Sequence, residues 1–416
     1  MKRVLMVAFH FPPASGSSGI QRTLRFVQHL PSLGWAPTVI SAHPRAYERT
    51  SSDLMKDLPP GITVERPFAV DVSRHLSVGG RYPAFLGRPD RWWPWRFGAV
   101  AAAMRLMRNQ RFDALWTTYP IATAHEIGLA CHRRSGMPWI ADFRDPMAQD
   151  GYPEDPATWR NFLRIEQQTI AHASRSVFTT PGAARMYRER YPAASGDRIV
   201  VIENGFDEQA FVLAGSGEEG PLGAGRVTLL HSGVVYPSER DPTHLFRALA
   251  RLEASGKIGS PGFVIRFRAS EHDSMLRRLA QAAGVLDLIE FAPPVSYDVA
   301  LNEMLRADAL LVMQASNCNA QIPAKVYEYL RAGRPILALT DPNGDTAKVL
   351  REAGVSAQAP LDSASAIADL LRRFVDESVH RSGWVPSADA VARASRQART
   401  VALAELLDQV VAEHAA

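Results

Sequence analysis

The chain has 416 residues, which suggests two or three domains at the usual domain size. Its composition, 46% hydrophobic and 22% charged, is that of a globular enzyme and excludes a largely disordered chain. The formal net charge of +4 is too small to imply a nucleic-acid-binding protein by itself.

The two cysteines, Cys131 and Cys318, lie far apart and offer neither a disulfide framework nor paired metal ligands, which fits a reducing cytoplasm. The apolar run 4–9 is shorter than the core of a signal peptide. The longest uncharged stretch, 26–44, contains three prolines and is unsuited to a membrane-spanning helix. We therefore expect a cytoplasmic protein, which can still sit peripherally on the inner face of the cytoplasmic membrane.

Strands and helices alternate along the first half of the chain. Short apolar runs predict buried strands at 4–9, 38–41, 115–118, 139–143, 177–180 and 199–202. Helical patterns lie between them at 20–30, 99–107, 122–135 and 159–173. This alternation is typical of a parallel, doubly wound sheet with helices on both faces.

A glycine-rich stretch, 215–225, has the composition of a linker. Beyond it, strands are predicted at 227–231, 264–268, 289–291, 309–313 and 336–339, with helices at 244–254, 274–283 and 299–306. We expect an α/β protein with two Rossmann-like domains, 1–208 and 209–388, and a terminal helix at 389–416.

Two loops are candidates for binding an anion. In doubly wound folds ligands bind beyond the carboxyl ends of the strands, where the loop 12–19 carries Gly16 and Gly19. In the segment 321–335, Lys325 and Glu328 are three residues apart and therefore share one face of a short helix. Pro323 is suited to the first position of that helix and Gly333 to its C-terminal cap. An ordinary loop and a surface Lys–Glu pair remain the alternative interpretations.

Four motifs, taken in order, resemble the glycosyltransferases of family 4. They are the opening strand with its glycine loop and the segments 142–146, 201–207 and 323–335. The resemblance covers nearly the whole chain and is closest to enzymes of bacterial surface-polysaccharide synthesis. It implies a GT-B fold, in which an acceptor-binding and a nucleotide-sugar-binding domain face a cleft and the last helix crosses back to the first domain.

The resemblance also assigns roles to residues of the second domain. Glu328 matches the second glutamate of the family's paired-glutamate motif and would hold the donor ribose. The first glutamate is replaced by Ala320, so that Asn319 and Gln321 are the alternative contacts to the donor sugar. The family's phosphate-binding loop here includes Gly233. At the position where the family usually has an arginine, this chain has Val234. Arg240 takes the lysine position, and Lys325 is a candidate for the second positive charge.

Three charged residues, Asp142, Arg144 and Asp145, follow a strand of the first domain. The resemblance places Arg144 near the donor sugar, and the two aspartates would orient acceptor hydroxyls or stabilise an oxocarbenium-like state. A structural ion-pair cluster is the alternative. His125 and His10 are further candidates for the catalytic site.

The segment 81–111 combines seven arginines with a single acidic residue and several aromatic residues. Such a mixture suits an anionic membrane surface, and the residues that would form it are Arg88, Arg91, Trp92, Trp93, Trp95 and Arg96. In the alternative interpretation, the tryptophans pack beneath the acceptor site and the arginines are merely solvated.

These observations predict a retaining glycosyltransferase that transfers a hexose from a UDP- or GDP-sugar to a glycan or lipid-linked acceptor of the cell surface. The nucleotide sugar is a substrate, so no cofactor is expected. The sequence holds no DxD motif or histidine–cysteine cluster that demands a metal, so we expect metal independence. A nucleotide-sugar epimerase of the same fold and a catalytically weakened GT-B binding subunit remain alternatives. No nucleic-acid partner is expected.

Overall fold

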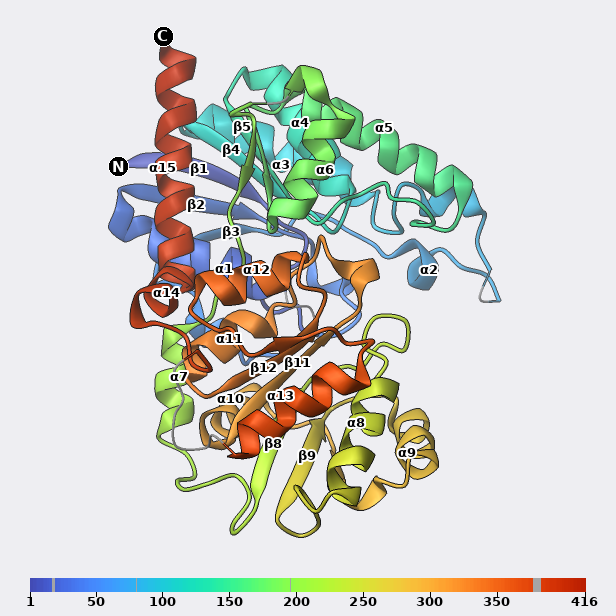
Figure 1. Ribbon diagram of the computed structural model, residues 1–416. Coiled ribbons are helices and arrows are strands. Elements are labelled where there is room, and N and C mark those ends of the chain that lie inside the picture. Colours follow the sequence, from blue (N-terminus) through green and yellow to red (C-terminus); the bar gives the residue numbers. More distant parts are fainter. Residues whose placement is uncertain (17–18, 80, 195, 377–382) are drawn as a thin grey trace. The chain divides into compact units, whose positions relative to one another are not determined.

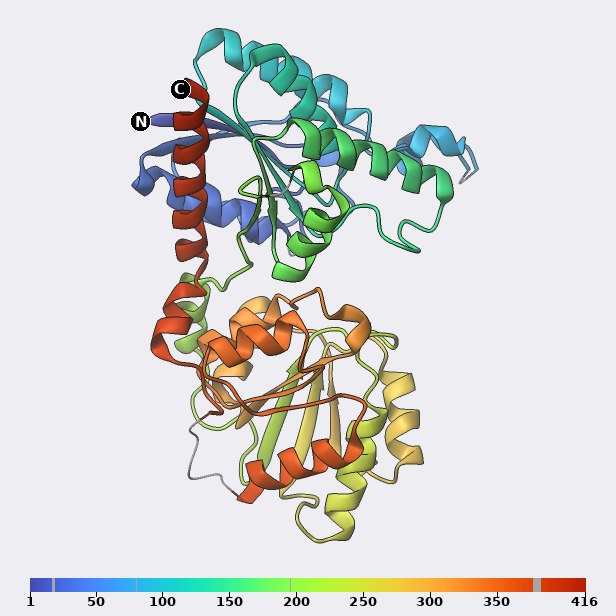
Figure 2. The same ribbon diagram turned by 45° about the horizontal axis from the view of Figure 1, so that its top comes forward.

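The computed structural model describes residues 1–16, 19–79, 81–194, 196–376 and 383–416. The chain forms two compact units, the first made of Met1–Glu203 with Arg396–Ala416 and the second of Asn204–Ser395 (Figures 1 and 2). Each unit is built on one parallel sheet, so the predicted α/β class is confirmed.

The first unit has a seven-stranded sheet in the order β3-β2-β1-β4-β5-β6-β7. Its strands are β1 (Lys2–Val7), β2 (Trp35–Ile40), β3 (Thr63–Glu65), β4 (Ala114–Thr118), β5 (Trp139–Arg144), β6 (Arg175–Phe178) and β7 (Ile199–Val201). Its helices are α1 (Gly19–His29), α2 (Val72–His75), α3 (Trp95–Asn109), α4 (Thr123–Ser135), α5 (Pro156–His172), α6 (Pro181–Arg190) and α15 (Arg396–Ala415).

The second unit has a six-stranded sheet in the order β10-β9-β8-β11-β12-β13. Its strands are β8 (Val227–Ser232), β9 (Phe263–Arg268), β10 (Ile289–Ala292), β11 (Ala309–Gln314), β12 (Ile336–Thr340) and β13 (Gln358–Ala359). Its helices are α7 (Glu208–Gly215), α8 (Thr243–Ala254), α9 (Asp273–Ala282), α10 (Tyr297–Arg306), α11 (Lys325–Ala332), α12 (Asp345–Glu352), α13 (Ala364–Asp376) and α14 (Ala388–Arg393).

Apolar layers cover both faces of each sheet. Along β11, Leu311 faces the layer formed with α8, α9 and α13, whereas its neighbour Leu310 faces the layer formed with α7, α10 and α11. This alternation is the period of two that a strand imposes on its side chains. In both sheets the chain reverses its winding beside the first strand, at β1–β4 and at β8–β11. The carboxyl ends of these strands are therefore where ligands are expected.

The end of the chain returns to the first unit. The predicted helix 389–416 is divided at Ala394 and Ser395: α14 belongs to the second unit, whereas α15 packs on α1. Arg175 and Glu413 form an ion pair of 2.7 Å that fixes the last turns of α15. The predicted return of the terminal helix is confirmed. The predicted single helix is wrong, because its first part, α14, packs in the second unit and its second part, α15, packs in the first.

The glycine-rich stretch 215–225 does not link the units. It lies inside the second unit between α7 and β8, where the amide of Leu222 donates to the carbonyl oxygen of Arg306 at 2.9 Å. The chain instead passes between the units at 203–204 and at 395–396. Within the described residues, no helix is long and apolar enough to cross a membrane.

A buried ion pair joins α1 to β5. The guanidinium of Arg22 contacts both carboxylate oxygens of Asp142, at 2.8 and 3.2 Å. It also donates to the carbonyl oxygens of Ile202 and Glu203, at 2.9 and 3.0 Å. Asp142 is fully buried and Arg22 is 7% exposed, so removal of one partner leaves an uncompensated buried charge.

We expect Asp142→Ala to lower the free energy of unfolding of the first unit by about 3–5 kcal/mol, measured by urea denaturation. Lys348→Ala is the control, because Lys348 forms only an exposed pair with Glu352, and its loss should cost less than about 0.5 kcal/mol. Equal effects of the two substitutions would contradict the structural role of Asp142.

Candidate functional site

Lys325 is the centre of a polar cluster at the carboxyl end of β8. It is the first residue of α11, and its Nζ lies 3.2 Å from Nε2 of His231 on β8. Gly233 follows β8 with a φ of 106°, a conformation that favours glycine. A Cβ there would lie 3.1 Å from the Lys325 ammonium, so the missing side chain leaves room for this cation.

The electrostatics of the cluster are set by burial. Nδ1 of the fully buried His231 lies 2.9 Å from the carbonyl oxygen of Leu311, which leaves Nε2 as an acceptor for Lys325. Burial and the adjacent Lys325 hold the pKa of His231 well below its usual range. Burial and nearby Arg240 lower the pKa of Lys325 to about 7, which Glu328 opposes. The lysine is therefore only partly charged near pH 7 until an anion approaches.

The helix α11 is attached to β8 by a buried tyrosine. The amide of Ser232 donates to Oη of Tyr329 at 2.9 Å, and Tyr329 is fully buried. Three residues past Lys325, Glu328 accepts a hydrogen bond of 2.8 Å from Oη of Tyr297 at the start of α10. The predicted pairing of Lys325 and Glu328 on one helix therefore places a cation and a carboxylate beside the end of β8.

Arg240 closes the loop after β8. Its Nη1 donates to the carbonyl oxygen of Val234 at 2.5 Å, and its guanidinium lies 5.1 Å from the centre of the Tyr236 ring. The Arg240 side chain is 13% exposed. The predicted phosphate-binding arginine thus lies against the glycine loop, close enough to Lys325 to lower its pKa.

The loop between β11 and α11 contains the predicted sugar contacts. Nδ2 of Asn319 donates to Asp341 at 2.8 Å, and the backbone carbonyl oxygen of Asn319 accepts from the amide of Asp345 at 2.8 Å. Asn319 therefore braces this loop, whereas Gln321 is exposed. The helix begins at Lys325 and not at the predicted Pro323, because Ala324 occupies the N-cap position. Gly333 ends it in the left-handed conformation, as predicted.

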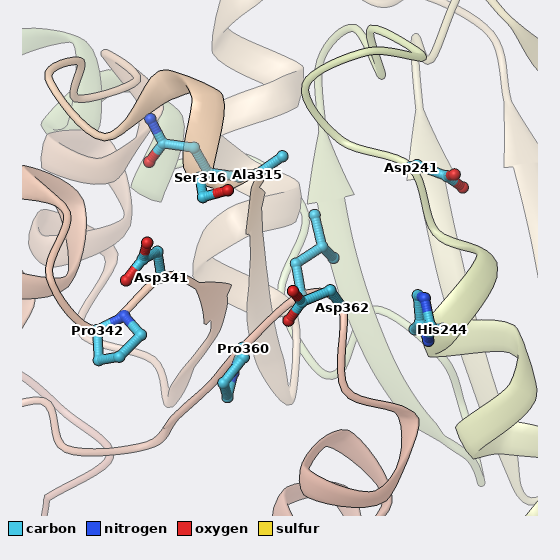
Figure 3. Close-up of a pocket in the computed structure, with 10 residues that line it drawn as sticks. Asp241, His244, Ala315, Ser316, Asp341, Pro342, Pro360 and Asp362 are labelled. Atoms are coloured by element: carbon cyan, nitrogen blue, oxygen red, sulfur yellow. The ribbon is translucent and has the colours of Figure 1, made fainter.

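A separate pocket of about 450 Å³ lies beyond β11, β12 and β13 (Figure 3). Its described lining carries three aspartates and no lysine or arginine, and consists of Asp241, His244, Gln314, Ala315, Ser316, Asp341, Pro342, Pro360, Leu361 and Asp362. Such a lining repels a diphosphate. The Lys325 cluster is therefore the better phosphate site.

In the first unit, Arg144 occupies a strained position at the end of β5. Its φ of 62° lies in the left-handed region, and the pairing of β5 with β6 shifts register between Asp142 and Arg144. Thr179 holds this conformation, because its amide and hydroxyl both donate to the Arg144 carbonyl oxygen, at 3.0 and 2.9 Å.

The strained backbone directs the Arg144 side chain toward the start of α1. Its Nη1 donates to the carbonyl oxygen of Tyr119 at 3.3 Å, and its buried Nε has no hydrogen-bond partner among the described residues. A Cβ on Gly19 would overlap this guanidinium, so Gly19 is needed for close approach. Burial and the Arg144 charge lower the pKa of His10 to about 4, so His10 is neutral at pH 7. Asp145, which follows Arg144, is exposed.

Two predicted catalytic residues are instead structural. Both carboxylate oxygens of the fully buried Asp142 are bound by Arg22. His125 lies on α4 with 0% exposure, its Nδ1 2.7 Å from Oγ1 of Thr117 and its ring 4.8 Å from that of Phe143. The prediction that they meet substrate is wrong, because neither side chain is accessible.

A cavity of about 220 Å³ lies beside His10 at the carboxyl end of β1. Aromatic and charged side chains share its lining, which consists of Phe9, His10, Ala14, Ser15, Gly16, Tyr47, Glu48, Arg49, Arg91 and Trp92. Gly16, with a φ of 82°, borders this cavity. Of the predicted anion loop 12–19, Ser17 and Ser18 lie outside the described residues.

The tryptophans predicted to form a membrane surface pack inward. Trp95 is 0% exposed, with its ring 5.5 Å from that of Phe9. Nε1 of Trp92 donates to the carbonyl oxygen of Ala46 at 3.1 Å, and Nε1 of Trp93 to that of Leu86 at 2.5 Å. The predicted membrane role of Trp95 is wrong, because its ring is fully buried, whereas Trp92 and Trp93 are half-buried and held by these internal hydrogen bonds.

The three arginines of this prediction all have carboxylate partners. Arg88 lies 3.1 Å from Asp155, and Arg96 lies 3.7 Å from Glu126. Arg91 pairs with Glu48 and stacks over Trp92 at 4.4 Å, so it belongs to the cavity beside His10.

Three residues of the second-unit site were not predicted: His231, Tyr297 and Tyr329. The spacing of Lys325 and Tyr329, four residues apart on one helix, was a usable signal for Tyr329. Nothing local in the sequence links His231 or Tyr297 to α11, since these contacts span 94 and 31 residues. Among the described residues, no group of three or more His, Cys, Asp or Glu side chains forms a metal site.

This chain is similar to one protein family and to named relatives. The model of Glycosyltransferase Family 4 matches residues 19–210. D-inositol 3-phosphate glycosyltransferase of Nocardiopsis dassonvillei is 28% identical over 68% of this chain and 66% of its own length, so the chain spans about two thirds of that relative. The enzyme of the same name from Geodermatophilus obscurus is 27% identical over 78% of this chain and 72% of its own length.

Solved structures share the fold over nearly the whole chain. Sucrose-phosphate synthase from Thermosynechococcus elongatus has a TM-score of 0.67 at 13% identity, covering 99% of this chain and 100% of its own. Anabaena HepE in complex with UDP has a TM-score of 0.66 at 15% identity, covering 98% and 100%. The fold is GT-B. The family 4 model matches slightly less than half of the chain, so the chain is similar to the family 4 glycosyltransferases over residues 19–210.

We expect Gly19→Ala to destabilise the first unit by about 1 kcal/mol or less, because the new methyl group forces the end of the Arg144 side chain to shift. Thermal unfolding measures this effect. Gly259→Ala is the control, since a Cβ at Gly259 meets open space. Arg144→Ala should relieve the penalty of Gly19→Ala; a Gly19→Ala protein as stable as the wild type would contradict the contact.

Proposed function

We propose that the protein transfers a hexose, with retention of anomeric configuration, from a UDP- or GDP-sugar to a glycan or lipid-linked acceptor in cell-surface polysaccharide synthesis. The single observation that carries this proposal is the convergence of Lys325, Gly233, Arg240 and Glu328 at the carboxyl end of β8. These residues provide cations, a carboxylate and a backbone position without a side chain at Gly233, which we call the glycine gap. A nucleoside diphosphate requires these features for binding.

The diphosphate of the donor would bind between Lys325 and the loop that begins at Gly233. The glycine gap lets phosphate oxygens approach, and the start of α11 adds a positive helix-dipole end. Negative charge develops on the diphosphate as the glycosidic bond breaks, so a preorganised cation beside it lowers the barrier. Lys325 supplies that charge in a loop where Val234 replaces the family's usual arginine.

The ribose of the donor would bind at Glu328. Its carboxylate is oriented by the hydroxyl of Tyr297 and keeps acceptor capacity for sugar hydroxyls. Gln321, whose side chain is exposed before α11, is the candidate contact to the donor sugar. Anabaena HepE has been solved with UDP and with UDP-glucose, which supports a UDP-sugar as the first donor to test.

The acceptor would bind in the first unit, in the cavity beside His10. Trp92 and Phe9 give it an apolar floor, while Arg49 and Glu48 provide a polar rim. The curated relatives are named for inositol 3-phosphate, and an anionic acceptor of that kind would complement Arg49. Arg144, whose buried Nε has no hydrogen-bond partner among the described residues, is the candidate cation of the first-unit site.

The reaction would proceed without a nucleophile on the enzyme. In this mechanism a phosphate oxygen of the leaving group accepts the proton of the acceptor hydroxyl as the new bond forms on the face left by the diphosphate. The first unit holds and orients the acceptor, and neutral His10 is able to hydrogen-bond a hydroxyl without competing for its proton.

Incubation with UDP- or GDP-sugars, with and without acceptors, separates this proposal from its alternatives. Product formation only with an acceptor supports a glycosyltransferase. Conversion of the nucleotide sugar without any acceptor identifies an epimerase, and nucleotide binding without turnover in every mixture identifies a binding subunit.

Glu328→Ala should weaken UDP binding by about 10- to 100-fold, because charge-assisted hydrogen bonds to the ribose are lost. Isothermal titration calorimetry measures the change. With 2′,3′-dideoxy-UDP, which lacks the ribose hydroxyls, wild type and Glu328→Ala should bind alike.

Tyr297→Phe is the matched control, since it keeps the Glu328 carboxylate and removes only the hydrogen bond that orients it. The UDP affinity of this variant should fall by about tenfold or less. Unchanged UDP affinity in Glu328→Ala would refute the ribose assignment.

Binding of UDP-glucose should be coupled to proton uptake by Lys325. Its pKa of about 7 in the free protein rises when the diphosphate binds, so affinity is highest below pH 7 and falls as the pH increases through that value. Calorimetry in buffers of different ionisation enthalpy should show uptake of about 0.5 proton at pH 7 and about 0.9 at pH 8.

Lys325→Arg is the control, because arginine keeps its charge across this range and should abolish the uptake. UDP-glucose is used because its diphosphate does not titrate near neutrality. Heats that do not depend on the buffer in the wild type would contradict the role of Lys325.

A further inference from the structure

A buried carboxylate on α5 holds the loop that follows β5. Glu166 is 0% exposed, and its Oε2 accepts a hydrogen bond from the amide of Ala148 at 3.1 Å. The same oxygen accepts from the hydroxyl of Tyr187 on α6, which in turn accepts from the amide of Met147 at 2.9 Å. Nη1 of Arg190, also on α6, donates to the Ala148 carbonyl oxygen at 2.6 Å and to Oε1 of Glu166 at 2.8 Å. We call Glu166, Tyr187 and Arg190 the Glu166 cluster.

Charge and protonation keep the contacts of the Glu166 cluster in place. Arg190 balances the Glu166 carboxylate, so that the buried anion is paired. Burial and the adjacent carboxylate raise the pKa of Tyr187 well above its usual range, so its hydroxyl stays protonated and donates to Glu166. Two amides and one carbonyl oxygen of residues 147–148 are thus bound by side chains from two helices. Such a loop is held in one conformation.

Only two residues separate the bound Met147 from Arg144. One of them is Pro146, whose ring fixes its own φ. At the other end of this segment, Thr179 donates from both its amide and its hydroxyl to the Arg144 carbonyl oxygen. A non-glycine residue remains in the left-handed region only where its surroundings determine its conformation from several directions. For Arg144, these surroundings are Thr179 on one side and the Glu166 cluster on the other.

We propose that Glu166 and Tyr187 are positioning residues of the candidate site in the first unit. By holding the loop 147–148, they keep Arg144 in its left-handed conformation, with its guanidinium at the start of α1 and its charge close to His10. Neither residue touches substrate, because each acts through the backbone of Arg144. The proposal rests on the proposed function only in giving Arg144 a role toward substrate. A merely structural cluster would stabilise the unit without determining where Arg144 lies.

Tyr187→Phe tests the proposal, because it removes the acceptor of the Met147 amide and keeps the aromatic ring. His10 reports where Arg144 lies, since burial and the Arg144 charge together hold the His10 pKa at about 4. At pH 5, His10 should be about 10% protonated in the wild type and about half protonated in Tyr187→Phe, because the cation moves away while burial remains. NMR of the full chain with ¹³C-labelled histidine measures this fraction, and the spectrum of His10→Gln identifies the signal.

Tyr191→Phe is the matched control. The Tyr191 hydroxyl donates to Oε1 of Glu166 at 2.6 Å and has no hydrogen bond to the loop 147–148 among the described residues. This variant therefore removes a donor from the same carboxylate but leaves the loop bound, and His10 should titrate as in the wild type. Thermal unfolding verifies that both variants are folded during the titration. Both variants leave unchanged the charged groups that line the cavity with His10, which are Glu48, Arg49 and Arg91.

Turnover is a second readout, which depends on the proposed function. With any acceptor that supports transfer, Tyr187→Phe should lower kcat by about 10- to 100-fold, because a displaced Arg144 no longer meets the reacting groups. Its affinity for UDP-glucose should equal that of the wild type, since the candidate donor site lies in the second unit. Tyr191→Phe should keep the wild-type kcat. A wild type without turnover would contradict the transferase proposal, whereas the His10 titration still decides the positioning role.

Two results would overturn the proposal. An unchanged His10 titration in Tyr187→Phe would show that Arg144 stays in place without the loop contact. Equal changes in Tyr187→Phe and Tyr191→Phe would show that any loss of a hydroxyl at Glu166 loosens the whole unit, so that the cluster is only structural.

Discussion

The first unit depends on one buried guanidinium. Arg22 joins α1 to the end of β5 through Asp142 and also holds the carbonyl oxygens of Ile202 and Glu203, where the chain leaves the unit. Because a buried charge must be satisfied from several directions, these three segments are fixed with respect to one another. Arg144 and Gly19, which lie next to this pair along the chain, are thereby held in the close contact that the candidate site requires.

In the second unit, by contrast, the cation of the candidate site has among the described residues no permanent carboxylate partner of the kind that Asp142 gives Arg22 in the first. Lys325, the proposed phosphate-site cation, lies beside a neutral histidine and a nearby arginine, so that it is only partly protonated in the absence of ligand. A full positive charge is therefore not stored permanently in a partly buried site, and it develops when an anion arrives. Lys325, from the adjacent helix, lies next to Gly233 and is therefore placed to supply the charge that the proposed phosphate site needs.

The fold was predictable from the sequence because buried parallel strands read as continuous apolar runs between helical patterns. β11 and β12, for example, fall within one residue of their predicted bounds. The candidate site was predictable only where its residues are close in sequence, as with Lys325 and Glu328. His231 and Tyr297 reach α11 through tertiary contacts that no local pattern records.

The errors have a common physical origin. Trp95 was assigned to a membrane surface and His125 to a catalytic site, and each side chain carries a polar group. Both residues are fully buried. Their apolar bodies fill the core, and local spacing does not reveal which side of a helix a long-range core will cover.

The return of α15 to the first unit has a consequence for the order in which the chain folds during synthesis. The apolar face formed by Leu24 and Val27 of α1 is covered by Leu403 and Leu407 of α15, which is synthesised after the second unit. The first unit therefore remains incomplete while the whole of the second unit is being made. The nascent chain must keep a strip of apolar surface uncovered for most of its translation, a stage at which chaperone binding would protect it from aggregation.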